Sequence, residues 1–200
     1  MPALSGVPFF FMQTQIRLRG RPVTAGFTLI ELLIVMAIVG ILGAAAVAGY
    51  RQVRARAGEA AAASALQAIN QAQFAFSQTC GNQRFAPNLA SLGARAPITG
   101  AAFLSPDLAT GDPAVMPGPP LEKSGYLITM TGTPVTEEIT TCIGVKPVSD
   151  YAVTADPLRP GISGHAFFGT NTDRVIFTDT ATFTGNMPGT GAPGHGAELR

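Results

Sequence analysis

The hydrophobic residues of this chain are concentrated in one stretch near its N-terminus. Residues 27–50 read FTLIELLIVMAIVGILGAAAVAGY, and Glu31 is the only charged side chain among them. The run from Leu32 to Tyr50 has 19 residues, roughly 28 Å as a helix at about 1.5 Å per residue. A hydrocarbon core is about 30 Å thick, whereas a soluble core helix of this length normally carries a polar stripe. The pattern therefore predicts a transmembrane helix over residues 27–50, with a buried core helix as the alternative.

A second helical pattern follows directly over residues 51–79. This segment has no Pro and is rich in Ala, Gln and Arg, most of which favour helices. A stripe with one polar member recurs at helical spacing; it consists of Ala62, Leu66, Ile69, Gln73 and Phe76. We predict one continuous helix over Phe27–Gln78, whose second half is amphipathic and packs this stripe on a globular head.

The composition changes after this helix. Residues 80–124 are rich in Gly and Pro with little periodicity, which predicts a long loop from helix to sheet. Within it, Asn88 is a candidate cap for a short helical turn, LASLG, that closes at Gly93.

Strand signals occupy residues 125–184, where β-branched and aromatic residues alternate with turn residues. The candidate strands are residues 126–131, 138–145, 151–155, 165–170 and 174–178, and Asn171 to Asp173 form a candidate hairpin turn. The predicted fold class is α+β, a long N-terminal helix packed on an antiparallel sheet of four or five strands. The Gly- and Pro-rich tail, residues 185–200, is expected to be largely irregular.

Basic residues on the two sides of the apolar run bear on its orientation. No acidic residue precedes Glu31, and the positive-inside rule places a basic N-terminal flank in the cytoplasm. Three basic residues on the other side weaken this asymmetry. The flanking residues are Arg17, Arg19 and Arg21 before the run and Arg51, Arg54 and Arg56 after it.

A secretory signal peptide has the same general layout, and cleavage after Ala46 would start the mature chain at Val47. Glu31 argues against this alternative. A carboxylate at membrane depth costs about 2.5–3.5 kcal/mol on insertion scales, and a signal peptide gains nothing from it. An acidic side chain in this position requires a functional partner.

Residues 26–50 resemble the N-terminus of the type IV pilin and type II secretion pseudopilin superfamily. The matching features are a basic leader and the run GFTLIELL, in which Glu31 is the fifth residue after Gly26. The resemblance is strong over residues 17–56 and only architectural beyond them. It implies that a prepilin peptidase removes the leader, residues 1–26, and that Phe27 is then N-methylated. The leader is long for that superfamily, and Met12 is an alternative start.

The role of Glu31 also follows from its position. Cleavage after Gly26 exposes an amino group on Phe27, and Glu31 lies four residues on, one helical turn away. The carboxylate can pair with its own amine or with Phe27 of a neighbouring copy. Because an uncompensated charge in a low dielectric is expensive, the pair favours a docked arrangement. Glu31 is therefore expected to set the register during assembly, as the resemblance also implies.

One departure from that superfamily concerns the middle of the apolar helix. Ala48 stands where many type IV pilins have a helix-breaking Pro. Gly40, Gly43 and Gly49 remain, and each lowers helix propensity by up to about 1 kcal/mol relative to Ala. Any bending or melting of the helix is expected between Gly40 and Gly49.

The two cysteines are candidates for a disulfide, because the resemblance places the head outside the cytoplasm, where disulfides form. Cys80 lies at the predicted helix end and Cys142 in a predicted strand. A bridge would close a loop of about 60 residues and contribute roughly 4 kcal/mol in the chain-entropy model. Two free buried thiols are the alternative. The spacing differs from the C-terminal disulfide loop of many type IV pilins.

Composition and charge argue against several other functions. Lys and Arg total 13 and Asp and Glu 12, so no large basic surface for nucleic acid is expected. The two histidines do not form a recognisable nucleophile, base and acid cluster; His165 is read as structural and His195 lies in the tail. Asp107 and Asp112 are a weak hint of a cation loop, with turn capping as the alternative. We expect no catalytic residues, bound metal or cofactor.

The resemblance leads to a structural protein rather than an enzyme. It implies a single-pass precursor in the bacterial cytoplasmic membrane, then a subunit of a periplasmic or extracellular filament, either a type IV pilus or a type II secretion pseudopilus. The implied partners are further copies of the chain, the prepilin peptidase, the membrane and an assembly platform with an external ATPase. The alternatives are a membrane-anchored periplasmic binding module that never polymerises and an ordinary secreted protein.

Overall fold

The computed structural model describes residues 26–97 and 99–199. Residues 1–25 of the predicted leader, with its three arginines, lie outside this part of the chain. The described residues divide into two units, one ending at Gly43 and the other beginning at Ala44, and each is described by itself.

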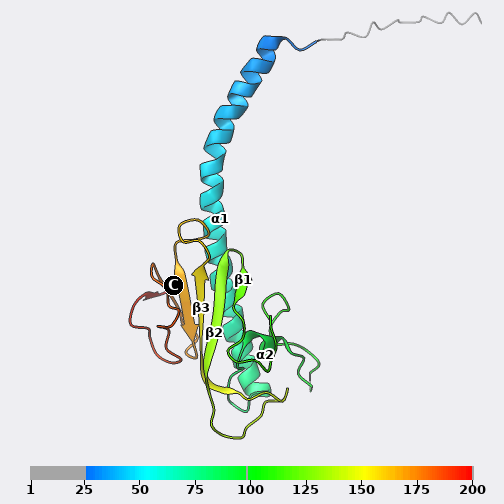
Figure 1. Ribbon diagram of the computed structural model, residues 1–200, viewed down its shortest axis with the longest axis vertical. Coiled ribbons are helices and arrows are strands. Elements are labelled where there is room, and N and C mark those ends of the chain that lie inside the picture. The colour runs from blue at the N-terminus through cyan, green and yellow to red at the C-terminus, as the bar shows by residue number, and fades with distance from the viewer. Residues whose placement is uncertain (1–25, 98, 200) are drawn as a thin grey trace, which may run out of the picture. The chain divides into compact units, whose positions relative to one another are not determined.

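The helix α1, Leu29–Thr79, has 51 residues and is coloured blue to green in Figure 1. Its bounds confirm the prediction of one continuous helix to within two residues at each end. The helical assignment continues through Gly40, Gly43 and Gly49, so α1 shows no melted segment there. By length and composition α1 can cross a membrane.

The second half of α1 presents one face to the head. The predicted stripe is buried throughout, since Leu66, Ile69, Gln73 and Phe76 are fully inaccessible and Ala62 is nearly so. Phe76 contacts Phe103 edge to face, with ring centroids 5.4 Å apart. The stripe therefore forms the helical side of the core, as its spacing predicted.

The other side of the core is a six-stranded sheet in which each strand pairs antiparallel with the next along the chain. The strands are β1 (Leu121–Lys123), β2 (Tyr126–Pro134), β3 (Val148–Pro157), β4 (Phe167–Asn171), β5 (Ile176–Asp179) and β6 (Ala197–Glu198). Alternate residues of β2 and β3, including Ile128, Val153 and Ala155, join the stripe of α1 in one apolar cluster. The predicted α+β class is confirmed, and Figure 1 shows the sheet beside the lower part of α1.

The strand predictions differ from the structure in three places. Four of the predicted strands correspond to β2, β3, β4 and β5. The predicted hairpin turn begins at Asn171, the last residue of β4, and leads to β5. The strands β1 and β6 were not predicted, because three and two residues are too few for an alternating pattern.

The predicted strand over residues 138–145 is wrong, because this segment forms turns without a sheet partner. Its backbone hydrogen bonds lie outside the sheet: Cys142 N–H donates to Cys80 O at 2.9 Å, and Thr141 N–H donates to Val145 O within the segment at 2.9 Å. The β-branched residues of this segment therefore belong to a loop that is held against the end of α1, and they form no strand of the sheet.

The short helix α2, Leu89–Gly93, begins at the predicted cap. Asn88 Oδ1 accepts the Ser91 N–H at 2.8 Å, while its Nδ2 donates to three carbonyls of the following loop, those of Asp112, Pro113 and Val115. One buried amide therefore caps α2 and holds the loop against it. This explains how a Gly- and Pro-rich segment keeps a defined path without regular structure.

The segment that follows β5, from Thr180 into the C-terminal tail, covers the face of the sheet that points away from α1. Phe183 is fully buried and lies against β4 at Gly169, where a Cβ would come within 3.0 Å of its ring. Thr184 Oγ1 lies 2.9 Å from Thr154 Oγ1 and donates to Asp156 Oδ2 on the same outer face of β3. The tail is thus a third layer, and the brown loops at the left of Figure 1 belong to it.

Polar side chains hold this tail in place. Asn171 Nδ2 donates to Pro188 O and Gly191 O, at 3.1 and 2.6 Å. His195 stacks on the Phe183 ring, 4.8 Å between centroids, and its Nδ1 lies 2.6 Å from Asp179 Oδ2. The tail has little regular structure, as predicted, but side-chain hydrogen bonds fix it in one conformation.

The polar member of the α1 stripe, Gln73, pairs with the backbone of Ala86. Its Nε2 donates to Ala86 O at 3.0 Å, and its Oε1 accepts Ala86 N–H at 2.8 Å. Both residues are fully buried. The side-chain amide therefore satisfies both backbone groups of Ala86 where the chain passes α1.

Replacing Gln73 by Leu should destabilise the head, because it leaves the buried N–H and C=O of Ala86 unpaired. We expect a loss of about 2–4 kcal/mol in unfolding free energy, measured by urea denaturation of the full chain in detergent. Gln71→Leu, at an exposed position of the same helix, is the matched control. Equal losses in the two variants would contradict the assigned role of the pairing.

The tail contact should also make stability depend on pH. The His195 hydrogen bond, with a further one from Thr180 N–H, lowers the pKa of Asp179. A lowered carboxyl pKa contributes stability that is present above the ordinary value and lost as pH falls through the folded value. We expect His195→Phe, which keeps an aromatic ring against Phe183, to flatten the acid limb of the stability curve. Adding Asp179→Asn to this variant should flatten the limb only slightly more, because the hydrogen bond from Thr180 N–H then remains the main influence on that carboxyl; a second change larger than the first would show that the His195 pair is not the main source of the pH dependence.

Candidate processing and assembly site

The predicted cleavage position lies immediately before α1. Gly26 and Phe27 have no regular structure and are exposed, with Phe27 83% accessible. Thr28 is the last residue before the helix. The predicted peptidase and methylation residues therefore adjoin the first turn of α1.

The first turn of α1 is closed by a reciprocal cap between Thr28 and Glu31. Glu31 Oε2 accepts the Thr28 N–H at 2.9 Å and the Thr28 hydroxyl at 2.7 Å. In return, Thr28 Oγ1 accepts the Glu31 N–H at 3.3 Å. This is a capping box, and it places a carboxylate at the positive end of the helix dipole.

This capping role of Glu31 was not predicted, although the Thr-x-x-Glu spacing carries the signal. The spacing between Phe27 and Glu31 points only to an amine as the partner of the carboxylate. In the uncleaved chain its charge is hydrogen-bonded within the first turn. Glu31 Oε2 receives both of these bonds, and the second carboxylate oxygen, Oε1, takes part in neither.

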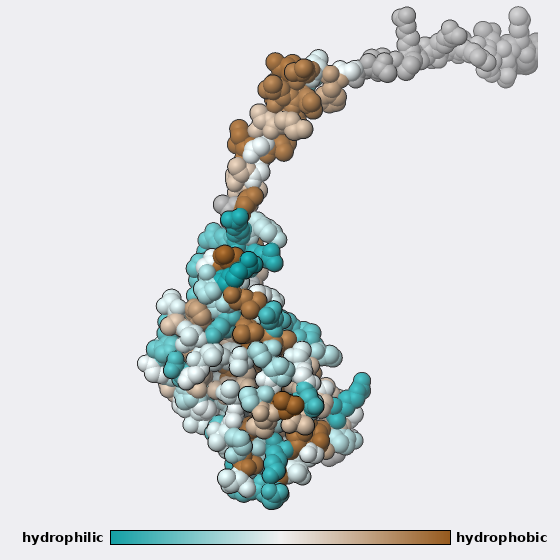
Figure 2. Space-filling model, in the orientation of Figure 1, coloured by the Kyte–Doolittle hydropathy of each residue, from teal (hydrophilic) through white to brown (hydrophobic). Residues whose placement is uncertain are grey.

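The helix around this site is apolar on every side. Its large hydrophobic side chains are all at least half exposed; they are Leu29, Ile30, Leu32, Leu33, Ile34, Val35, Met36, Ile38, Val39, Ile41, Leu42 and Val47. Figure 2 shows them as a brown segment. Large apolar surfaces of this kind require lipid or other apolar helices around them. Glu31 is thus a single charge at the end of an otherwise apolar surface.

The predicted disulfide is present between Cys80 and Cys142, whose Cα atoms are 4.8 Å apart. It joins the residue that follows α1 to the loop before β3, and it spans 62 residues of sequence. Cys80 is buried in the core cluster. The alternative of two free thiols is therefore wrong, and the bridge fixes the C-terminal end of α1 to the sheet side of the head.

The other candidate residues occupy separate places in the head. His165 was read as part of an apolar strand, but it precedes β4 and is exposed. Lys123 contacts Asp107, and its hydrogen bond, followed by one from Ser105, lowers the pKa of Asp107 to about 2. Asp112 Oδ1 accepts the Ala114 N–H at 2.9 Å, a turn cap.

These positions do not converge on a reactive centre. Asp107 is engaged by a lysine and Asp112 by its own loop, the contacts expected of structural carboxylates. Among the residues that the structure describes, no group of three or more His, Cys, Asp and Glu is placed to hold a metal ion.

Two shallow hollows lie on the exposed side of α1, with volumes of about 290 and 260 Å³. Both are lined by Phe74 and Arg174, and the Arg174 guanidinium lies 4.5 Å above the Phe74 ring. Their remaining lining is mostly amide side chains. They provide an uneven uncharged surface beside one arginine rather than a catalytic pocket.

Comparison with known proteins identifies the N-terminal segment. Residues 21–47 match the family model described as the prokaryotic N-terminal methylation motif, the signature of prepilin-type segments in type IV pilins and pseudopilins. The match includes Gly26, Phe27, Thr28 and Glu31. No curated protein and no solved structure matches the chain significantly. The chain therefore carries a pilin-type precursor segment, and that motif marks structural rather than catalytic proteins.

Removing the disulfide should destabilise the head without changing its sheet. For Cys80→Ala/Cys142→Ala we expect roughly 4 kcal/mol less unfolding free energy, the chain-entropy value for a loop of this length. Denaturation curves of the oxidised chain, the reduced chain and the variant provide the comparison. The reduced chain should behave like the variant; an unchanged stability in both would contradict a stabilising role for the bridge.

Proposed function

We propose that the chain is a prepilin whose mature form polymerises into a type IV pilus or a type II secretion pseudopilus. The observation that carries this proposal is Glu31, one carboxylate in the first turn of an exposed apolar helix whose start matches the methylation motif. A structural subunit accounts for both the apolar helix and the charge. Neither is needed by a protein that is simply released into solution.

In this proposal, processing changes the chemistry at the start of α1. The prepilin peptidase cuts between Gly26 and Phe27 and removes residues 1–26, and Phe27 is then N-methylated. The new terminal amine is positive before and after methylation. It lies next to Thr28 and one helical turn from Glu31, so cleavage brings a cation to the carboxylate that the capping box already holds.

Assembly then depends on which terminal amine forms an ion pair with the carboxylate of Glu31. In the bilayer an unpaired charge is costly, and the pair is satisfied either within one chain or between neighbouring copies. Glu31 Oε2 caps its own helix, and in this proposal the second oxygen, Oε1, accepts from the amine of Phe27 in another subunit. Only one stagger between neighbouring helices satisfies this contact, so it sets the register of the filament.

The exposed face of α1 in the head supports packing against other helices. From Ala60 to Thr79 the helix has no ionisable side chain, although a helix that faces water normally carries charges there. The exposed positions on this face are Ser64, Gln67, Gln71, Phe74 and Gln78. Small, amide and aromatic side chains of this kind suit a contact with neighbouring subunits.

The proposed life of the protein begins as a single-pass precursor in the bacterial cytoplasmic membrane, with the head on the far side. The prepilin peptidase and an assembly platform are the first partners. An external ATPase supplies the work of extracting the apolar helix from lipid. The mature filament then lies in the periplasm or outside the cell, with further copies of the chain as its main partners.

The proposal is tested by two substitutions of Glu31 in the native cell. Glu31→Ala removes charge and cap, whereas Glu31→Gln keeps an oxygen that accepts from Thr28 and removes only the charge. We expect both variants to be cleaved and to accumulate in the membrane, and both to form few filaments by electron microscopy. Filament formation by Glu31→Gln at the normal level would show that the charge does not direct assembly.

The mature N-terminus separates the remaining alternatives. Mass spectrometry should find methylated Phe27 at the start of the processed chain. A start at Val47 would instead identify a secreted protein. A processed chain that functions normally with Glu31→Ala and never forms filaments would identify a membrane-anchored binding module.

A further inference from the structure

The loop between β3 and β4, residues 158–164, exposes two large hydrophobic side chains at one end of the head. Leu158 is 43% and Ile162 60% accessible, and the exposed Arg159 lies between them in the sequence. Single exposed apolar side chains are common on soluble proteins, whereas a group of them marks a contact surface. Two of them on one short loop beside an arginine make this loop a candidate contact surface.

Hydrogen bonds within this loop close it into a defined turn, on which the two apolar side chains are exposed. Arg159 O accepts the N–H groups of Ile162 and Ser163, at 3.0 and 2.9 Å. Gly161 N–H donates to Gly164 O at 2.8 Å, and Arg159 N–H donates to Ser163 Oγ at 3.0 Å. A compact hydrogen-bonded turn thus holds Leu158 and Ile162 outward.

The same loop is fastened to α1 just beyond the apolar run. A Cβ on Gly58 would come within 2.9 Å of Ser163 O, so the loop backbone touches the helix there. Glu59 Oε1 accepts the His165 N–H at 2.8 Å, which fixes the start of β4 to the next helical residue. Gly58 follows Tyr50 by about 12 Å along the helix.

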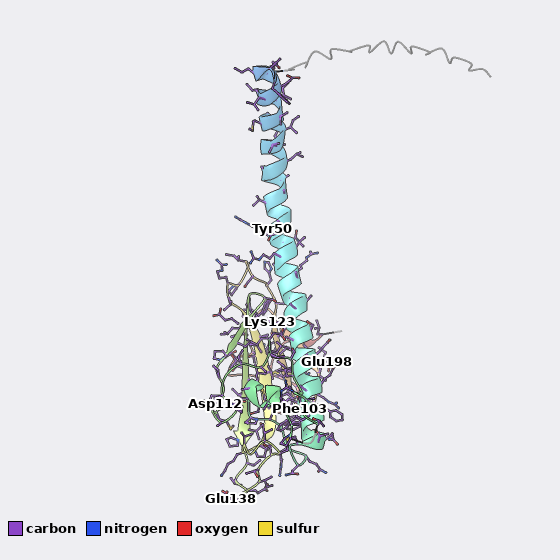
Figure 3. All side chains as sticks on the ribbon, turned by 90° about the vertical axis from the view of Figure 1, so that its right-hand side faces the viewer. Tyr50, Phe103, Asp112, Lys123, Glu138 and Glu198 are labelled. Atoms are coloured by element: carbon purple, nitrogen blue, oxygen red, sulfur yellow. A yellow bond between two sulfur atoms is a disulfide. The ribbon has the colours of Figure 1, made fainter. Side chains whose placement is uncertain are left out.

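Basic side chains occupy the helix between these points. Arg51, Arg54 and Arg56 are exposed and form no ion pair with any residue that the structure describes. Tyr50, 66% accessible, precedes them at the depth where interfacial aromatics anchor a span. Figure 2 shows this hydrophilic band directly after the brown segment, and Figure 3 places Tyr50 and Lys123 towards one end of the head, with Glu138 at the other.

These positions match the layers of a membrane surface. The headgroup region is about 5–8 Å thick on each side of the hydrocarbon core, and the three arginines lie within roughly 9 Å of Tyr50 along the helix. The loop adds two apolar side chains and a fourth arginine next to the same helical turns, since its backbone touches Gly58.

We infer that residues 158–164, with Arg51, Arg54 and Arg56, form a docking surface for the anionic phospholipid headgroups of the membrane that α1 spans. The arginines contact lipid phosphates, and Leu158 and Ile162 enter the interface. Glu59 lies beside the loop, where its carboxylate accepts the backbone N–H groups of His165 and Ala166, and its single negative charge is outnumbered by the four arginines. Docking would hold the head against the membrane until assembly extracts the subunit. The inference rests on the proposed membrane span, and goes beyond it in assigning a second membrane contact to the head.

The absence of Trp from the chain allows a direct test with a single fluorescent reporter. The full chain carrying Ile162→Trp is reconstituted in vesicles of phosphatidylcholine alone, or of equal parts phosphatidylcholine and phosphatidylglycerol, each with brominated acyl chains as quencher. Val115→Trp is the matched control, because Val115 is similarly exposed on the loop held by Asn88. We expect quenching and a blue shift for Ile162→Trp in the anionic vesicles and neither for Val115→Trp.

Replacing the four arginines by Gln in the Ile162→Trp chain separates charge from apolar contact. The ratio of docked to undocked head should fall about fivefold for each arginine removed, and added salt should lower it further. Equal quenching in neutral and anionic vesicles, or none at position 162, would overturn the inference. Quenching that appears only at high protein-to-lipid ratio would assign the loop to a second copy of the chain and overturn the lipid assignment.

Flotation of the vesicles distinguishes a failure of the docking inference from a failure of the proposed function. If the Ile162→Trp chain floats with the vesicles while its Trp fluorescence stays that of a water-exposed side chain, the helix spans the membrane but the loop does not contact it. A chain that does not float has no span, which overturns both.

Discussion

The constraint on which the rest of the molecule depends is that one helix must satisfy two surroundings. The first part of α1 is apolar on all faces, and its large side chains are exposed in the isolated chain; the second part buries only one stripe. The change occurs between Tyr50 and Arg51, where an interfacial aromatic is followed by three arginines. Everything on one side of this point requires lipid or other helices, and everything on the other requires a head that covers one face and leaves the opposite face available.

The head covers one face of the second part of α1 with a sheet that has few long strands, and many side-chain hydrogen bonds hold the rest of the head together. Four buried amides connect segments that are distant in the sequence or lack regular structure: Asn70, Gln73, Asn88 and Asn171. Asn70 accepts from the Tyr151 hydroxyl and donates to Thr170, which joins α1 to β3 and β4. Because a buried amide has two donors and two acceptor sites, each can hold two backbone paths in place. This allows a chain with 23 Gly and 16 Pro to form an ordered three-layer head.

The same organisation separates the two ends of the head. At one end, the disulfide fixes the end of α1 to the loop before β3. At the other, Gly58 and Glu59 hold the β3–β4 loop against the helix beside the arginines. α1 is therefore attached at both ends of its buried stripe, so force applied along the helix is transmitted to the whole head rather than to one strand.

The elements with a long repeating signal followed from the sequence alone. The apolar run, the stripe from Ala62 to Phe76, the cap at Asn88 and the strands β2 to β5 depend on local periodicity and turn chemistry, which neighbouring residues express directly. The family of the N-terminal segment followed as well, because GFTLIELL is a contiguous pattern. The tertiary structure decided what depends on residues distant in sequence: the strands β1 and β6, the turns at residues 138–145, and the folding of the tail over the sheet through Asn171, Asp179 and His195. These features have no periodicity of their own, since single side-chain contacts across the fold create them. The double use of Glu31, as a helix cap and as the proposed partner of Phe27, became visible only once its carboxylate could be placed against Thr28.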